Sequence, residues 1–247
     1  MPRPKNRRKA RKTLQANRAA EERYARTLAD IVRAAGERLR HAALGTRSDA
    51  GASSHARDVE SVFAKLVKPL SRAVSDAWHD MFLSLSKANA AGLSSLGIPV
   101  RRDVGLSAIM ERSMSDSVSL IKDTVGTLKA ETLAIIGDPE NVGLRVEDLA
   151  DLIRERTGVS ESRAELIARD QTLKTNGNLT ANRQRNAGIT SYVWSTSLDD
   201  RVRPDHAALE GKTIAWDDPP DVGHPGEDIQ CRCVAIPVID EFAGLDD

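Results

Sequence analysis

The apolar residues of this chain recur at helical spacing over most of its length and at strand spacing only near its end. From Thr13 to Leu44, and again from Ile109 to Ile136, apolar side chains return every three or four residues with charged residues between them. From Tyr192 to Ser195 the large aromatic residues occupy alternate positions, as in a half-buried strand. The spacing predicts an α+β protein, with a mostly helical N-terminal two-thirds and a small C-terminal domain in which a long helix packs on a small antiparallel sheet.

Two positions are predicted to interrupt the helical pattern. Pro69 lies inside the apolar stripe that runs from Val59 to Leu85, and its missing N–H and fixed φ should kink or end a helix there. Gly158 is typical of a helix C-cap, and Ser160 is typical of the N-cap of a following helix. We therefore expect a short helix over 146–157 and a long one from 160 to about 186.

Beyond Gly188, which favours a left-handed helix stop, the pattern becomes that of strands and turns. Strands are predicted at 192–195, 212–216 and 231–238, with a short helix at 204–210. The domain organisation that follows is a disordered basic arm at 1–12, a helical domain at 13–157 with a linker near 45–54, a C-terminal domain at 158–240 and an acidic tail at 241–247.

The net charge of zero hides a strong asymmetry along the chain. Residues 1–40 carry thirteen Lys and Arg against four Asp and Glu, whereas residues 196–247 carry four against thirteen. A chain with a basic start and an acidic end can meet two different surfaces, or pair end to end between copies. No apolar run follows the basic start, so we expect neither a secretory signal nor a membrane-spanning helix.

The basic start is a candidate contact for an anion. Seven of the ten residues from 3 to 12 are cationic, and no aromatic residue is interleaved with them. Such a run predicts contact with DNA phosphates, or with an acidic protein surface, rather than base stacking; a solvated tail without a partner is the alternative. The candidate contact residues are Arg3, Lys5, Arg7, Arg8, Lys9, Arg11 and Lys12.

Both cysteines of the chain fall near its end, one residue apart. This number and spacing argue against a disulfide framework and favour a reducing cytoplasmic setting. Cys231 and Cys233, with His206 and His224, would supply a Cys2His2 ligand set suited to zinc. The alternative is that the thiols are small packing groups and that no cofactor is bound.

The other conspicuous polar residues of this region predict a shape-holding network rather than a reaction centre. Charged side chains between the predicted strands could interlock by charge-assisted hydrogen bonds and tie long loops to a small sheet. With Arg169 and Asp170 of the preceding helix, the structural set comprises Asp199, Asp200, Arg201, Arg203, His206, Gly211 and Arg232.

The run from Ser195 to Val238, STSLDDRVRPDHAALEGKTIAWDDPPDVGHPGEDIQCRCVAIPV, resembles the C-terminal domain of the Mu F-like phage head morphogenesis proteins. The resemblance extends upstream through SRAELIARDQTLKTNGNLTANRQRNAGITSYVW and covers roughly the last third of the chain. The sequence Ala168-Arg169-Asp170-Gln171 also resembles a string typical of that family.

The resemblance implies a non-enzymatic minor head protein that acts in capsid assembly, near the portal and inside the procapsid. It implies the portal or the major capsid protein as partners, and residence in the host cytoplasm during assembly and then in the phage head. We also expect the amphipathic helices to drive self-association, the basic arm to reach packaged DNA, and no membrane to be involved.

An enzymatic alternative is a metal-dependent nuclease, or a DNA-binding protein of a mobile element, that uses the cluster His206, His224, Cys231 and Cys233. Asp217 and Asp218 could join a histidine base and a divalent ion in such a site. The sequence contains no phosphate-binding Gly-rich loop, nucleophile motif or dinucleotide fingerprint that would support an enzyme of another class.

Overall fold

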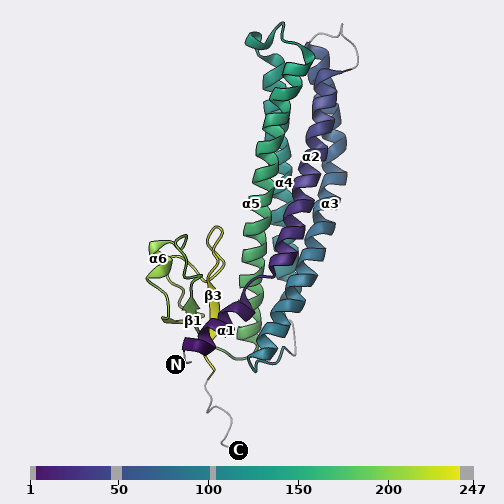
Figure 1. Ribbon diagram of the computed structural model, residues 1–247. Coiled ribbons are helices and arrows are strands. Elements are labelled where there is room, and N and C mark those ends of the chain that lie inside the picture. The colour runs from purple at the N-terminus through teal and green to yellow at the C-terminus, as the bar shows by residue number, and fades with distance from the viewer. Residues whose placement is uncertain (1–3, 46–51, 101–103, 240–247) are drawn as a thin grey trace, which may run out of the picture. The chain divides into compact units, whose positions relative to one another are not determined.

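A computed structural model describes residues 4–45, 52–100 and 104–239 of the chain (Figure 1). The predicted acidic tail at 241–247 and most of the predicted linker lie outside these residues, as does Arg3. Among the described residues, none of the helices combines the length and apolarity needed to cross a membrane.

The predicted α+β class is confirmed: long helices come first, and a small sheet follows near the end of the chain. The elements are α1 (Pro4–Leu14), α2 (Arg18–Leu44), α3 (Ala52–Ser95), α4 (Leu106–Gly137), η1 (Pro139–Asn141), α5 (Val146–Asn186), β1 (Ser191–Ser195), α6 (Pro204–Ala207), β2 (Thr213–Ala215) and β3 (Val234–Pro237).

The sheet has three antiparallel strands in the order β2-β1-β3. Tyr192 in the central strand lies opposite Ile214 on one side and Pro237 on the other. The helix α5 ends at Asn186, as predicted. Gly188, two residues later, has a left-handed φ of 79°, which turns the chain into β1.

The chain divides into two compact units, each built from separate stretches of sequence. Unit 1 contains residues 1–20, 82–113 and 170–247, and unit 2 contains residues 21–81 and 114–169. Only the last stretch of unit 1 overlaps the C-terminal domain predicted at 158–240, because α1 and parts of α3 and α4 also belong to unit 1.

Unit 2 is a bundle formed by segments of α2, α3, α4 and α5 (Figure 1). The predicted apolar stripes are buried within it: Leu28, Leu39, Trp78, Ile121 and Ile153 are all fully buried. Close packing also requires small residues, since a Cβ at Gly36 of α2 would lie 2.5 Å from the Thr157 side chain of α5. The stripes are therefore covered by the chain itself.

The helix ends predicted at Pro69 and Gly158 are both wrong. Pro69 lies inside an unbroken α3, and Gly158 and Ser160 lie inside an unbroken α5. A proline inside a helix costs about 3 kcal/mol, but Leu66 and Leu70 beside it are buried, and burying one such side chain contributes roughly 1.5–3 kcal/mol. Ser160 is itself buried, so packing rather than capping tendency decides its conformation.

The prediction of a disordered arm at 1–12 is also wrong for its described part, because residues 4–14 form α1. Pro4 is the first residue of this helix, where a missing N–H costs nothing. Ala10 and Leu14 are buried in one cluster with Leu93 at the end of α3 and with Val234 and Ile236 of β3. Two apolar residues four apart therefore anchor a helix that is otherwise strongly cationic.

Two glycines of α5 should respond oppositely to the same substitution. A Cβ at Gly177 would lie 2.6 Å from the carbonyl oxygen of Pro225, whereas a Cβ at Gly158 would meet nothing within 4 Å. We expect Gly177→Ala to lower the free energy of unfolding by about 1–3 kcal/mol. The control, Gly158→Ala, should raise it by about 0.5–1 kcal/mol through helix propensity alone. Urea unfolding measures both, and equal effects of the two substitutions would refute the close approach at Gly177.

Candidate metal centre and the loops around it

His206 is held in place by the short helix α6. Pro204 begins this helix, and the Asp205 carboxylate accepts a hydrogen bond from the backbone N–H of His206 at 2.9 Å. The imidazole is 2% exposed, and its ring meets that of Trp194 in β1 edge-on with centroids 5.5 Å apart. The sequence predicted a helix here, and the burial of His206 follows from the packing of that helix against β1.

Cys231 and Cys233 lie in the turn that leads into β3, not within the strand as predicted. The strand begins at Val234, and the backbone N–H of Cys231 donates to the carbonyl of Asp228 at 3.1 Å. Gln230 has a φ of 52°, a left-handed conformation that bends the chain immediately before the first cysteine. Both thiols are free and buried, so the turn carries them into the interior.

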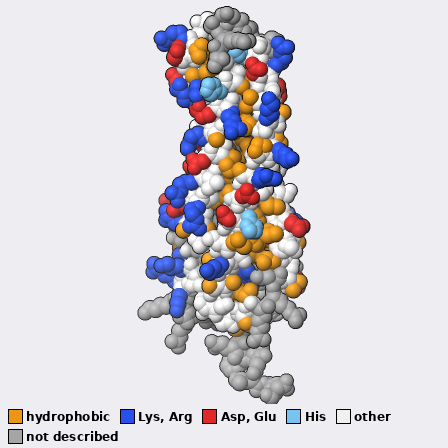
Figure 2. Space-filling view, turned by 90° about the vertical axis from the view of Figure 1, so that its right-hand side faces the viewer, with side chains coloured by type: hydrophobic (Ala, Val, Ile, Leu, Met, Phe, Trp, Pro, Cys, Tyr) orange, Lys and Arg blue, Asp and Glu red, His pale blue; other side chains and the backbone are white. Residues whose placement is uncertain are grey.

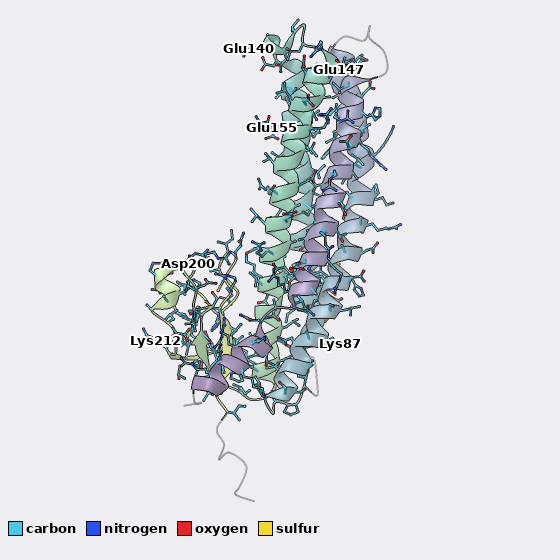
Figure 3. All side chains as sticks on the ribbon, viewed as in Figure 1. Lys87, Glu140, Glu147, Glu155, Asp200 and Lys212 are labelled. Atoms are coloured by element: carbon cyan, nitrogen blue, oxygen red, sulfur yellow. The ribbon has the colours of Figure 1, made fainter. Side chains whose placement is uncertain are left out.

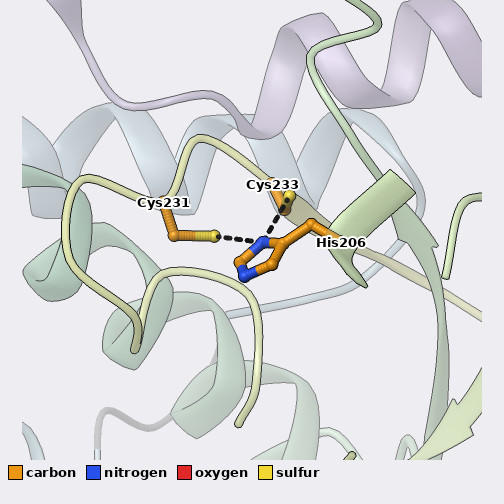
Figure 4. Close-up of side chains that lie close together, drawn as sticks. All are labelled: His206, Cys231 and Cys233. Carbon is orange, nitrogen blue, oxygen red and sulfur yellow. Dashed lines mark hydrogen bonds between the residues drawn. The ribbon is translucent and has the colours of Figure 1, made fainter. Parts of the chain in front are cut away.

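The structure brings three of the four predicted metal ligands together (Figure 4). The Nδ1 atom of His206 lies 3.6 Å from Sγ of Cys231 and 3.5 Å from Sγ of Cys233. The three ligand atoms all lie within 4.8 Å of one another. A side chain from α6 and two from the turn before β3 thus converge, although more than twenty residues separate them in sequence.

Asp228 completes the surroundings of His206 on the opposite side of the ring. Its Oδ2 atom lies 3.2 Å from Nε2 of His206 and 2.9 Å from Nη1 of Arg203. Arg203 also donates to the carbonyl of Ile229 at 2.7 Å. With Nε2–H donating to the carboxylate, the lone pair of the imidazole is on Nδ1 and faces the two sulfur atoms.

The two thiols differ in proton affinity. A hydrogen bond from Cys233 lowers the pKa of Cys231, and backbone N–H groups of Gly226 and Cys233 act in the same direction. The same hydrogen bond raises the pKa of Cys233, as does its burial. Burial of the Cys231 thiol opposes the lowering of its pKa, and the two thiols form one interacting pair.

His224, the fourth predicted ligand, lies elsewhere in unit 1. Its Nδ1 atom is 2.9 Å from the hydroxyl of Tyr192, and its ring centroid is 4.9 Å from that of Trp216. Burial lowers the pKa of this histidine. It packs with Tyr192 of β1 and with Trp216, which follows β2, and the predicted Cys2His2 set is therefore divided into three candidate ligands and one packing residue.

The predicted polar network exists as two separate groups rather than one. The carboxylate of Asp199 accepts both guanidinium N–H groups of Arg232 at 2.6 and 2.7 Å, and also the backbone N–H of Arg201. Arg203, Asp228 and His206 form the second group. Asp200 is exposed at the surface (Figure 3), and the side chain of Arg201 is exposed as well.

The other members of the predicted structural set have local roles. Asp170 in α5 accepts from the backbone N–H of Gln230 at 2.7 Å, which ties the turn before the cysteines to the helix. Arg169 pairs with Glu21 of α2 at 3.3 Å, within unit 2. Gly211 has a φ of 78° and donates its N–H to the carbonyl of Trp194.

The cationic residues of α1 are partly engaged within the chain. Arg7 pairs with Glu210 at 3.2 Å, so a residue of the basic start meets one of the acidic end within a single copy. Arg8, Lys9 and Lys12 are exposed, whereas Arg11 is half-buried. The side chain of Lys5 lies outside the described residues.

Sequence reasoning missed Asp228, which fixes the orientation of His206. Its position three residues before Cys231 was the available signal, but a lone aspartate in a loop is ordinarily solvated.

The acidic residues named for a nuclease, Asp217 and Asp218, are exposed. In the described part of the chain, the only His, Cys, Asp or Glu group close enough to hold a metal is His206 with the two cysteines.

Residues 141–236 match the family described as Phage Mu protein F like protein, which confirms the resemblance predicted from the sequence. An uncharacterised protein of Haemophilus influenzae (strain ATCC 51907 / DSM 11121 / KW20 / Rd) is 48% identical over 95 residues. The matched region is 38% of this chain and 21% of that relative, so the chain spans about a fifth of the relative's length. No solved structure matches the chain.

The Asp199–Arg232 pair predicts a specific acid sensitivity. The pair lowers the pKa of Asp199 to about 2, below its unfolded value of about 3.9. Its contribution to stability is therefore complete above pH ~4 and is lost as the pH falls towards 2. We expect Asp199→Asn to flatten the pH dependence of the unfolding free energy between pH 5 and 2. Asp217→Asn, which changes an exposed carboxylate, should leave that dependence unchanged; identical profiles for Asp199→Asn and wild type would contradict the assignment.

Proposed function

We propose that this chain, with its Phage Mu F-like region at residues 141–236, acts in phage head morphogenesis as a minor head protein close to the portal inside the procapsid. The match to that family is the observation that carries the proposal. The matched region includes the part of α5 that lies in unit 1, the three strands and the cysteine-bearing turn. It therefore covers most of a packed structure rather than an isolated motif.

The chemistry of the chain is consistent with a structural role. Its conspicuous polar residues bond one another and the backbone, as the Asp199–Arg232 and Asp228–Arg203 pairs do. The nuclease alternative lacks support from the described residues, because Asp217, Asp218 and His224 do not gather into one site. A protein of this kind would be made in the host cytoplasm and would become part of the phage head.

Partner contacts would use the exposed surface of the helices, because their apolar stripes are already buried inside the chain. Figure 2 shows Lys and Arg side chains intermixed with Asp and Glu on one face, with apolar side chains between them. Several acidic side chains of unit 2 are also exposed, among them Glu140, Glu147 and Glu155 (Figure 3). The proposed partners, the portal, the capsid protein or a second copy, would contact this exposed surface.

A capture experiment tests the head role. The tagged chain would be co-expressed with the portal protein and, separately, with the major capsid protein of the same phage, and a tail protein would serve as the control bait. We expect retention of the chain by the portal at moderate salt and its presence in purified procapsids by mass spectrometry. Absence from procapsids, together with equal retention by all three baits, would overturn the proposal.

A second proposed contact, with packaged DNA, rests on the exposed cations of α1. Replacing Arg8, Lys9 and Lys12 by Gln removes three charges and leaves the buried Ala10 and Leu14 in place. If all three bind phosphates, the slope of log affinity against log salt should fall by about 2–3, since each contact contributes roughly 0.9. The matched control replaces Lys65, Lys68 and Arg72, which are exposed on α3. Equal slopes for the two triple variants, measured by DNA retention across a salt series, would exclude α1 as the contact.

A further inference from the structure

We propose that the chain binds one zinc ion through Nδ1 of His206 and the sulfur atoms of Cys231 and Cys233, with the fourth position taken by water or another small ligand. Asp228 is the positioning residue, because it bonds the far nitrogen of His206 and not the metal site itself. The proposal concerns unit 1 alone and does not depend on the head role. It also differs from the four-residue set predicted from the sequence, because His224 is excluded.

The distances match the edges of a zinc tetrahedron. With Zn–S bonds of about 2.3 Å and Zn–N bonds of about 2.05 Å at tetrahedral angles, a sulfur and a nitrogen ligand lie about 3.6 Å apart. The two observed Sγ···Nδ1 distances are 3.6 and 3.5 Å. Both sulfur atoms are thus at ligand spacing from the same nitrogen.

Hydrogen bonding alone explains the arrangement less well. A neutral imidazole that donates from Nε2 has one lone pair, on Nδ1, and this lone pair can accept one strong hydrogen bond. One thiol can donate to Nδ1 while the other bonds the neighbouring sulfur, but that pattern gives no reason for both sulfur atoms to lie at nearly equal distances, 3.6 and 3.5 Å, from Nδ1. A cation between the three atoms is a common partner of all of them and accounts for the equal spacing.

Charge balance favours zinc in this buried position. His206, Cys231 and Cys233 are 2%, 4% and 9% exposed, and an uncompensated charge among them would be costly. A divalent zinc ion, two thiolates and a neutral imidazole sum to zero. The neighbouring Asp228 carboxylate is separately paired with Arg203 at 2.9 Å.

The surroundings also have the features of a built metal site. A carboxylate that accepts a hydrogen bond from the non-ligating nitrogen is the usual partner of a zinc-binding histidine, and it fixes both tautomer and ring orientation. The ion would join α6 to the turn before β3 and so close the long segment between β1 and β3.

Metal analysis and cobalt substitution test the proposal on the full chain. Protein purified without chelator should contain one zinc ion per chain by elemental analysis. After removal of zinc, Co²⁺ should restore a bound ion with thiolate-to-cobalt charge-transfer absorption in the near ultraviolet. This absorption reports sulfur ligation in the wild-type protein directly, so the test stands even if a cysteine variant fails to fold.

The variants separate the ligands from their neighbours. Cys231→Ser and Cys233→Ser should lose the metal, and Asp228→Ala should bind it ten- to a hundredfold more weakly. His224→Gln is the matched control, because it changes the other buried histidine of unit 1 and should retain one ion per chain. Chelator should lower the unfolding temperature of wild type and of His224→Gln, but not that of Cys231→Ser.

Three results would overturn the proposal. The first is a wild-type protein that takes up no zinc on reconstitution. The second is bound Co²⁺ without thiolate charge-transfer absorption. The third is loss of metal by His224→Gln as complete as that by Cys231→Ser, with the helical circular dichroism of both unchanged.

Discussion

The structure of unit 1 depends on the polar side chains that the last turns of α5 bury. Asn176 donates to the carbonyl of Leu14 at the end of α1, and Gln184 donates to the carbonyl of Ala235 in β3. Arg183, only 3% exposed, donates to the backbone and side chain of Ser86 in α3. One helix thereby holds three other elements, α1, α3 and β3, through hydrogen bonds. Because hydrogen bonds are directional, they fix the orientation and register of these elements more specifically than apolar contacts do.

Polar bonds also help to order the segment between β1 and β3, in addition to the apolar cluster that Trp216, Cys231 and Cys233 form with Tyr192 and Trp194. Between β1 and β3 the chain is mostly loop, and its conspicuous residues act as point contacts that each join distant stretches. Asp199 reaches Arg232, Asp228 reaches His206, and Asp170 of α5 reaches the backbone of Gln230. Each bond is individually modest, but together they constrain a long loop at several places along its length.

Local chemistry made a large part of this structure predictable. The helical period identified the long helices, Gly188 marked the end of α5, and the alternating aromatic residues marked β1. The predictions failed where burial outweighed local preference. Pro69 and Ser160 lie inside helices because their neighbours, or they themselves, are buried. The cationic start is helical because Ala10 and Leu14 find a cluster supplied by α3 and β3.

The sequence by itself determined the fold class, the family resemblance and the ligand types near the end of the chain, since each is a property of residue identity and spacing. Tertiary structure alone decided which of those ligands meet. Cys231 and Cys233 join His206 because the turn at Gln230 and the helix α6 face each other, and His224 packs against Tyr192 instead. The spacing of residues in the sequence cannot predict which histidine joins the cysteines, because that outcome depends on how loops close between elements that are distant in sequence.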